Sequence, residues 1–187
     1  MRLFLAINLP PETRGELHAA TAPLRLAAPG VSWVNEERLH LTLKFFGERP
    51  DTDVPVLAGA GRAVAHRHRA TEITLAGIGC FPNFRRPRVV WIGVGENPRL
   101  ELVQHDVEEA FHALGFEIEG GVFRPHVTLA RTRPDAPPEQ AAAIAAAARM
   151  IDFHADVSVT TLDLMQSTTG RDRPRYAVLD AAPLRSD

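Results

Sequence analysis

Two short stretches of the chain carry the same arrangement of residues that could do chemistry. One leucine separates His40 from Thr42, and one valine separates His126 from Thr128. In both stretches polar residues alternate with apolar ones, the period of a half-buried strand whose successive side chains point to opposite faces. Each histidine therefore shares a face with its threonine, and the two side chains can contact one small polar group together.

A pair of such stretches suits acid-base chemistry at phosphorus. Histidine has an unperturbed pKa of about 6.5, so one neutral and one protonated ring supply a base and an acid near neutral pH. A displacement in which one oxygen enters and the opposite oxygen leaves needs these two groups on opposite walls of a cleft. Thr42 and Thr128 could donate hydrogen bonds to the two non-bridging phosphate oxygens.

The rest of the sequence predicts the elements that must position these residues. Hydrophobic periodicity predicts strands over residues 2–9, 39–46, 71–78, 89–94, 153–166 and 176–180, besides the strand of the second histidine. Prolines and capping residues predict helices over residues 11–22, 53–69, 98–115 and 138–150, with Pro23 ending or kinking the first of them.

The first and second halves of the chain resemble each other when their histidine stretches are aligned. His126 follows His40 by 126 − 40 = 86 positions, and the same shift pairs Leu3 with Val89 and Ile73 with Val159. Three strands at one offset, with helices in both gaps, predict one unit used twice. We expect each copy to bury its apolar sheet face against its own helices, which leaves the two polar faces to line a shared cleft.

Composition excludes several other classes of protein. The chain has 187 residues, 45% of them hydrophobic, and a net charge of -2, which argues against a sequence-blind nucleic-acid coat. A single cysteine, Cys80, permits no intrachain disulfide. The apolar run in residues 1–9 is too short for a signal peptide or a membrane span, so a cytoplasmic protein is expected.

Other site chemistries fit the motifs less well. Neither motif has a third histidine or a carboxylate at short spacing, as a zinc site would need, so no metal is expected. The glycines lack the order and the strand-to-helix setting of a phosphate-binding loop or a dinucleotide fingerprint. The six other histidines are read as surface or helix positions.

The two motifs and their flanks resemble the two-histidine phosphoesterase superfamily. Within it, the chain is similar to the bacterial and archaeal RNA 2′,3′-cyclic phosphodiesterases, also called 2′-5′ RNA ligases. The resemblance spans nearly the whole chain and rests on residues 2–7, Leu9, Pro10, Trp33, 39–45, Gly47, 88–91, Phe123, 125–131, Arg175 and Tyr176.

This resemblance implies both a fold and an activity. The fold would be α+β, with two pseudo-symmetric lobes, each a mainly antiparallel sheet backed by helices, around a central cleft. Residues 1–187 would form a single bilobal domain with an internal repeat, roughly 1–84 and 85–187. The activity would be hydrolysis of a 2′,3′-cyclic phosphate at an RNA end, tRNA fragments among them, to a 2′-phosphate by a monomer that needs no cofactor.

The resemblance also implies roles for single residues. His40 would protonate the departing 3′ oxygen and His126 would activate water, while Thr42 and Thr128 hold the phosphate. With a 5′-hydroxyl in place of water, the reverse reaction would join RNA through a 2′-5′ bond without ATP. The pseudo-symmetry of the sequence does not itself decide which histidine is the acid.

Further residues are candidates for substrate binding. Phe45 could stack on a terminal base and Arg131 could hold phosphate, but strict alternation places both on the face opposite the histidines, so Arg131 would need a twist or bulge. Arg124 and the basic loop 85–88 could follow an RNA backbone. Tyr176 matches the family near the end of the chain, and packing is its alternative role.

Three other interpretations stay open at this point. The substrate could be a small cyclic phosphate or a 2′-5′ oligonucleotide. The cleft could instead belong to a nucleotide-binding or RNA-binding module, although such a module has no need for paired acid-base groups. The duplicated fold could also be purely structural, with no role for the histidines.

Overall fold

The structure, a computed structural model, describes residues 1–169 and 174–186, and it has the α+β class that the sequence predicted. Its strands are β1 Arg2–Asn8, β2 Ser32–Trp33, β3 His40–Glu48, β4 Thr71–Phe81, β5 Val89–Val94, β6 His126–Arg131, β7 His154–Val159, β8 Thr161–Thr169 and β9 Pro174–Pro183. Its helices are α1 Pro11–Ala20, α2 Ala22–Ala27, α3 Val54–Ala65, α4 Pro98–His112 and α5 Pro138–Ala148, with short 3-10 turns η1 Glu36–Arg38 and η2 Asp51–Asp53.

Local chemistry sets several of these boundaries as expected. The first predicted helix, residues 11–22, is α1 and ends at Ala20. Pro23 lies in the first turn of a second helix, α2, which the sequence did not predict, at a position where a missing N–H costs nothing. The side chain of Asn97 accepts a hydrogen bond of 2.9 Å from the Leu100 amide and caps α4. The long strand expected over residues 153–166 is two strands, β7 and β8, separated at Thr160.

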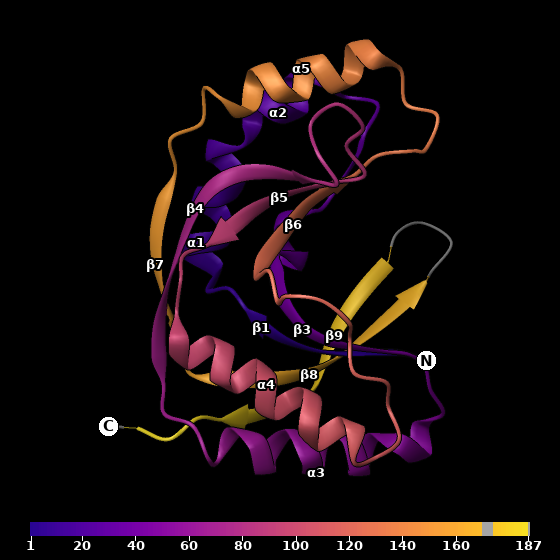
Figure 1. Cartoon of the computed structure of the whole chain (residues 1–187), viewed down its shortest axis with the longest axis vertical. Helices are drawn as coiled ribbons and strands as arrows, with labels where there is room; N and C mark the ends of the chain where they lie inside the picture. Colours follow the sequence, from indigo (N-terminus) through magenta and orange to yellow (C-terminus); the bar gives the residue numbers. More distant parts are fainter. Residues whose placement is uncertain (170–173, 187) are drawn as a thin grey trace.

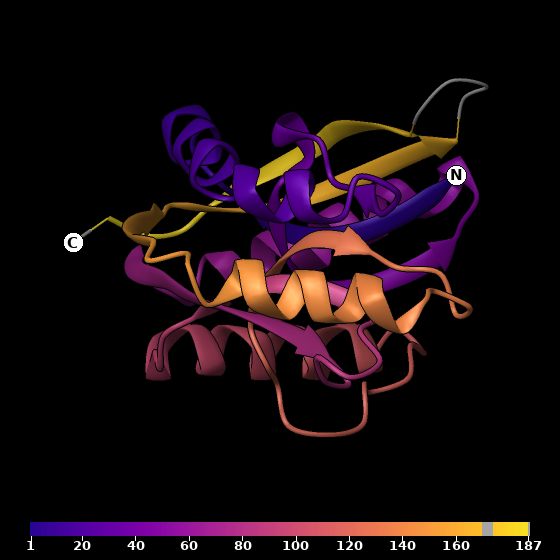
Figure 2. The same ribbon diagram turned by 90° about the horizontal axis from the view of Figure 1, so that it is seen from above.

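The strands of the described residues form one curled antiparallel sheet with β3 and β6 at its centre. The order is β7-β4-β5-β6-β3-β1-β8-β9, and β2 adds to β6. Helices α3 and α4 lie together on the outside of one half of the sheet, and α2 and α5 on the outside of the other (Figure 1). Seen from above, the β8–β9 hairpin projects beside the start of β1 (Figure 2), with which β8 pairs.

A pseudo-two-fold axis passes between β3 and β6, where Leu41 pairs with Val127. These two residues are 127 − 41 = 86 positions apart, the offset of the repeat. The pseudo-two-fold axis therefore exchanges Leu41 with Val127. The lobes, however, are not the two halves of the sequence. Strand β4 pairs with β5, and β8 pairs with β1, so each half contributes a strand to the other lobe.

The helices are exchanged in the same way. Helix α3, from the first half, packs on β8, β9 and α4, while α4, from the second half, packs on β3. The expectation that each copy buries its sheet face against its own helices is therefore wrong. The apolar periodicity of a helix shows that it must pack on a sheet, but not on which strands of the sheet it packs.

Neither of the other two predicted strand equivalences holds at the 86-residue offset. Strand β4 pairs with β5 and β8 pairs with β1, so β4 corresponds to β8, and the predicted equivalence of Ile73 with Val159, a residue of β7, is wrong.

The first strand departs from the offset by one residue. Ile7 and Ile92 stand opposite the two central residues of β3 and β6, so β1 and β5 are related by 92 − 7 = 85 positions. The predicted equivalence of Leu3 with Val89 is thus wrong by one residue, because the connection to the next strand is one residue longer in the second half. A continuously apolar strand such as β1 lacks the alternation that would fix its register.

The core is one large cluster of aliphatic and aromatic side chains between the sheet and its helices, built from both halves of the chain. Leu5 from β1, Leu41 from β3 and Val127 from β6 are each no more than 1% exposed. Within the described residues, no helix combines the length and apolarity needed to cross a bilayer.

Candidate active site

Both histidines of the motifs begin a central strand and are fixed by the same contact. Nδ1 of His40 lies 2.7 Å from the carbonyl oxygen of Arg38, and Nδ1 of His126 lies 2.8 Å from that of Arg124. A carbonyl oxygen only accepts, so each Nδ1 carries a proton. Nε2 is therefore the nitrogen that can gain or lose a proton toward a ligand.

The register of the central strands brings the two motifs together. Since Leu41 pairs with Val127 in an antiparallel ladder, His40 stands across from Thr128, and Thr42 stands across from His126. All four side chains are on the face opposite the buried leucines and valine of these strands. The predicted pairing of each histidine and threonine on a shared face is confirmed, and the two pairs meet.

Two adjoining cavities of about 450 Å³ each lie over this face. We name them the His40 cavity and the His126 cavity, because each contains one of the two histidines. Both are lined by Arg2, Thr42, Phe45, Thr128 and Arg131. The two threonines thus stand between the histidines, where a phosphate that contacts both rings would lie.

Phe45 and Arg131 reach the cleft because both central strands are irregular at the same place. The β1–β3 register shifts between Leu5 and Ala6, and the β5–β6 register shifts between Val90 and Trp91, which inserts one extra residue into each central strand. Alternation is reversed beyond that residue, so both side chains return to the histidine face. The expectation from strict alternation is wrong for Phe45, and the bulge that Arg131 required is present.

The surroundings of both rings disfavour the protonated form in the free protein. Burial lowers the pKa of His40, and the charges of Arg38, Arg131 and His126 lower it further, against the opposing effect of the Arg38 carbonyl. Burial also lowers the pKa of His126, with Arg131 acting in the same direction and the Arg124 carbonyl in the other. A bound anion would offset the repulsion and favour a proton on one ring.

Comparison with known proteins decides the family. Residues 9–171 match the family model described as the 2′-5′ RNA ligase superfamily. The chain belongs to this superfamily. The names of its relatives, which are RNA 2′,3′-cyclic phosphodiesterases, confirm the predictions that the chain is an enzyme and a hydrolase of the phosphodiesterase class.

Relatives support the same membership over nearly the whole chain. An RNA 2′,3′-cyclic phosphodiesterase of Thermus thermophilus is 34% identical over 100% of this chain and 92% of its own. One of Geobacillus stearothermophilus is 33% identical over 97% of this chain, which spans only 56% of that relative's length.

Solved structures agree on the fold. The crystal structure of the Thermus thermophilus protein TT0787 has a TM-score of 0.80 and 32% identity, with 100% of both chains covered. Escherichia coli LigT, complexed with 3′-AMP, has a TM-score of 0.76 and 28% identity and covers 98% of this chain and 97% of its own.

The two histidines of this superfamily member have different aromatic neighbours. The His40 ring contacts Phe4 and Tyr176, at centroid distances of 5.0 and 5.4 Å, and those two rings lie 5.3 Å from each other. The His126 ring lies 5.0 Å from Phe81 and 6.3 Å from Trp91. The predicted site residue Tyr176 is thus part of the His40 cavity, and the pseudo-symmetry of the sequence is not kept in the walls.

The structure adds two arginines that the sequence interpretation missed. Arg2 lines both cavities, and its guanidinium lies 4.8 Å from the centre of the Phe45 ring. Arg38 lines the His40 cavity, and its guanidinium lies 5.7 Å from the centre of the Tyr176 ring. A signal for Arg38 existed, since the 86-residue offset relates it to Arg124, which lines the His126 cavity.

The remaining predictions concern the basic loop and metals. Arg85, Arg86 and Arg88 are exposed and line neither cavity. In the part of the chain that the structure describes, no three His, Cys, Asp or Glu side chains gather into a group that could hold a metal ion.

Proposed function

We propose that this protein hydrolyses the 2′,3′-cyclic phosphate at an RNA end to a 2′-phosphate, with its two motif histidines as acid and base. The observation that carries this proposal is the cleft itself, in which two rings held by their Nδ1 atoms flank two threonine hydroxyls. The names of the relatives and the 3′-AMP complex of LigT support the substrate class.

In this proposal each step has an assigned group. His126 takes a proton from water as its oxygen bonds to phosphorus, the bond from phosphorus to the 3′ oxygen breaks, and His40 gives its proton to that oxygen. Thr42 and Thr128 donate hydrogen bonds to the non-bridging oxygens, whose charge Arg131 stabilises. The assignment of His40 as the acid follows the family resemblance.

The proposal also orients the substrate. The departing 3′ oxygen belongs to the terminal ribose, so the RNA would occupy the His40 cavity, where Arg2 and Arg38 supply positive charge. Phe45, which is 43% exposed, would offer a face on which a base can stack. The entering oxygen would come from the His126 cavity, and a 5′-hydroxyl there would give the reverse, ligating reaction. The protein would act as a monomer in the cytoplasm.

One assay tests this function. Purified protein is incubated with a short RNA ending in 2′,3′-cyclic phosphate, with a chelator present, and the product isomer is identified. We expect a 2′-phosphate product, and a loss of roughly 100-fold or more in kcat/KM for His40→Ala and for His126→Ala. His105→Ala, which changes an exposed histidine on α4 outside both cavities, is the matched control.

The same assay separates the alternatives. Turnover of cyclic mononucleotides or of a 2′-5′ dinucleotide, without turnover of the RNA, would favour the small-substrate alternative. Tight RNA binding without turnover of any of these compounds would favour a binding module. Unchanged turnover in both histidine variants would contradict the proposed catalysis.

A further inference from the structure

A buried ion pair lies beside the His126 cavity and has no part in the proposed chemistry. Lys44, the only lysine of the chain, places its Nζ 2.6 Å from Oε2 of Glu108, and the two side chains are 2% and 7% exposed. A buried pair of this kind contributes little net stability, because removing two charges from water costs about as much as their attraction returns. A role other than stabilising the fold is therefore to be sought for it.

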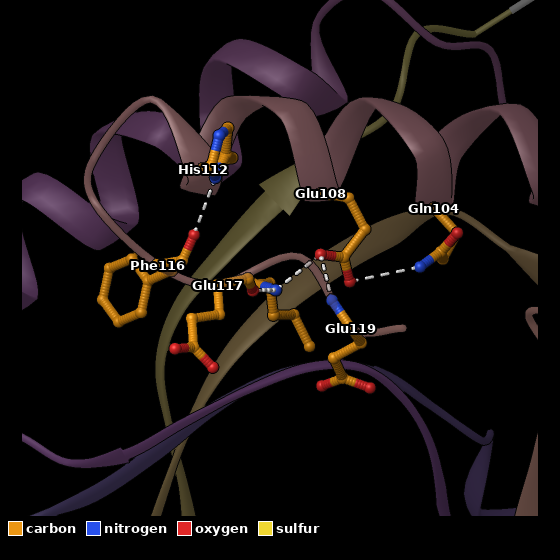
Figure 3. Close-up of polar contacts among 7 residues, drawn as sticks. Gln104, Glu108, His112, Phe116, Glu117 and Glu119 are labelled. Carbon is orange, nitrogen blue, oxygen red and sulfur yellow. Dashed lines mark hydrogen bonds and ion pairs between the residues drawn. The ribbon is translucent and has the colours of Figure 1, made fainter. Parts of the chain in front are cut away.

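Lys44 and Glu108 hydrogen-bond to backbone groups of the loop that follows α4. Lys44 donates from Nζ to the Glu117 carbonyl at 2.8 Å, and Oε2 of Glu108 accepts from the Glu119 amide at 3.2 Å. Gln104, one turn earlier on α4, donates to the other carboxylate oxygen at 3.2 Å. Figure 3 shows Gln104, Glu108 and the loop residues Glu117 and Glu119 converging at this point beneath the helix.

The segment that follows is part of the candidate active site. Residues 119–124, which include two glycines, line the His126 cavity. The segment ends at Arg124, whose carbonyl accepts from Nδ1 of His126. The side chains of Ile118 and Val122 are 48% and 85% exposed, so between Phe116 and Phe123, which pack against the core, the loop has little apolar anchoring of its own.

We propose that Lys44 and Glu108 are positioning residues for the His126 side of the cleft. By fixing the backbone at residues 117 and 119, they set the wall of the His126 cavity and, through Arg124, the ring of His126. The bulge in β3 makes this possible, because it turns Lys44 into the interior beside Leu43. The other half has no such device, since the residue at 44 + 86 = 130 is an alanine. The inference rests on the proposed function for its effect on turnover.

The test is the double variant Lys44→Met/Glu108→Leu, which removes both charges and keeps apolar bulk. Either single variant leaves one buried charge unpaired and can fail to fold, whereas the double variant is expected to melt near the wild-type temperature. We expect its kcat/KM on the cyclic-phosphate RNA to fall roughly 10- to 100-fold, because the reacting groups are misplaced. A folded double variant with wild-type kcat/KM would overturn the proposal.

Two further readouts do not depend on turnover. Amides of residues 117–124 should exchange hydrogen faster in the double variant, and the pKa of His126, measured by NMR titration, should fall because the Arg124 carbonyl no longer stabilises the protonated ring. If the wild type fails to turn over the RNA, the proposed function fails, and these two readouts still decide the inference. Wild-type exchange together with a wild-type pKa would contradict it.

A matched control removes an ion pair elsewhere. Arg62 on α3 and Asp180 on β9 form a more exposed pair at 2.5 Å, and neither residue lines the His126 cavity. The variant Arg62→Met/Asp180→Asn should keep the wild-type kcat/KM, exchange rates and His126 pKa. A similar loss in this control would mean that the effect is not specific to the loop.

Discussion

Each histidine of the cleft is held by the carbonyl of the residue two positions before it. The same two-residue geometry occurs at Arg38–His40 and at Arg124–His126. It fixes the tautomer of the neutral rings and directs Nε2 to the ligand, so the two halves present equivalent groups. Burial and the charge of Arg131 lower the pKa of both rings, and the charge of Arg38 lowers that of His40 alone.

These shifts predict the pH dependence of the free enzyme's reaction. Turnover needs one ring protonated and the other neutral, so kcat/KM is highest between the two pKa values. Both values are lowered, and we therefore expect an optimum below the ordinary histidine value of about 6.5. Arg131→Gln should move the optimum to higher pH, because it removes a charge that disfavours both protonated rings.

Measurement of kcat/KM against pH for the wild type and the variant checks this prediction. Arg133→Gln is the control, because Arg133 is highly exposed and lines neither cavity of the cleft. A wild-type optimum above the ordinary histidine pKa, or an equal shift in both variants, would contradict the argument.

The bulges in β3 and β6 decide which side chains enter the cleft. An extra residue in each strand turns Lys44 and Ala130 inward and returns Phe45 and Arg131 to the histidine face. The same bulge occurs in both copies, so the two strands present equivalent positions to the cleft. One of these positions holds Phe45, which can stack on a base, and the other holds the cationic Arg131. The two sides of the pseudo-symmetric cleft therefore differ in the side chains that contact a substrate.

Two adjacent phenylalanines test this reversal of alternation. Phe46 is 7% exposed and packs 4.6 Å from the Phe111 ring, so Phe46→Ala should lower the free energy of unfolding by about 3–5 kcal/mol. Phe45→Ala should change it by less than about 1 kcal/mol. It should instead lower kcat/KM on RNA by about 10-fold or more, since a stacked base contributes about 1–3 kcal/mol.

Urea unfolding and steady-state kinetics on the two variants distinguish these effects. The Phe46 variant serves as the control for Phe45, because it removes the same side chain one position along the strand. If Phe45→Ala were the more destabilising change, the bulge would not place the side chain as described.

In the molecule as a whole, the two halves of the sequence are interlocked. Strand β4 completes the lobe built around β5 and β6, strand β8 completes the one built around β1 and β3, and α4 crosses to β3. Exchange of elements makes one core from two copies. It also fixes the position of β3 against β6, on which the geometry of the four motif residues depends.

This exchange predicts that neither half folds alone. Residues 1–84 and 85–187, produced separately, should lack cooperative thermal unfolding, because each leaves the apolar face of its exchanged strand and helix in water. When co-expressed, the two fragments should form one complex with the activity of the intact chain, since the break lies within the largely exposed loop of residues 82–88 between β4 and β5. Circular dichroism and activity measurements check both outcomes, and a cooperative transition in either isolated half would contradict the exchange.

The sequence by itself determined what depends on neighbours along the chain. Alternation placed each histidine beside its threonine, Asn97 marked the start of α4, Pro23 marked the end of the first predicted helix, and the 86-residue offset paired the two motifs. These features were readable because side-chain periodicity and capping involve residues only a few positions apart.

Only the tertiary structure decided what depends on contacts between distant segments. The bulges that return Phe45 and Arg131 to the cleft are defined by pairing with β1 and β5, so alternation alone misplaced both residues. The exchange of strands and helices is invisible to periodicity, which records an apolar face but not its partner. The contact of Lys44 with Glu108 joins residues 64 positions apart, and only the packing of α4 on β3 brings them together.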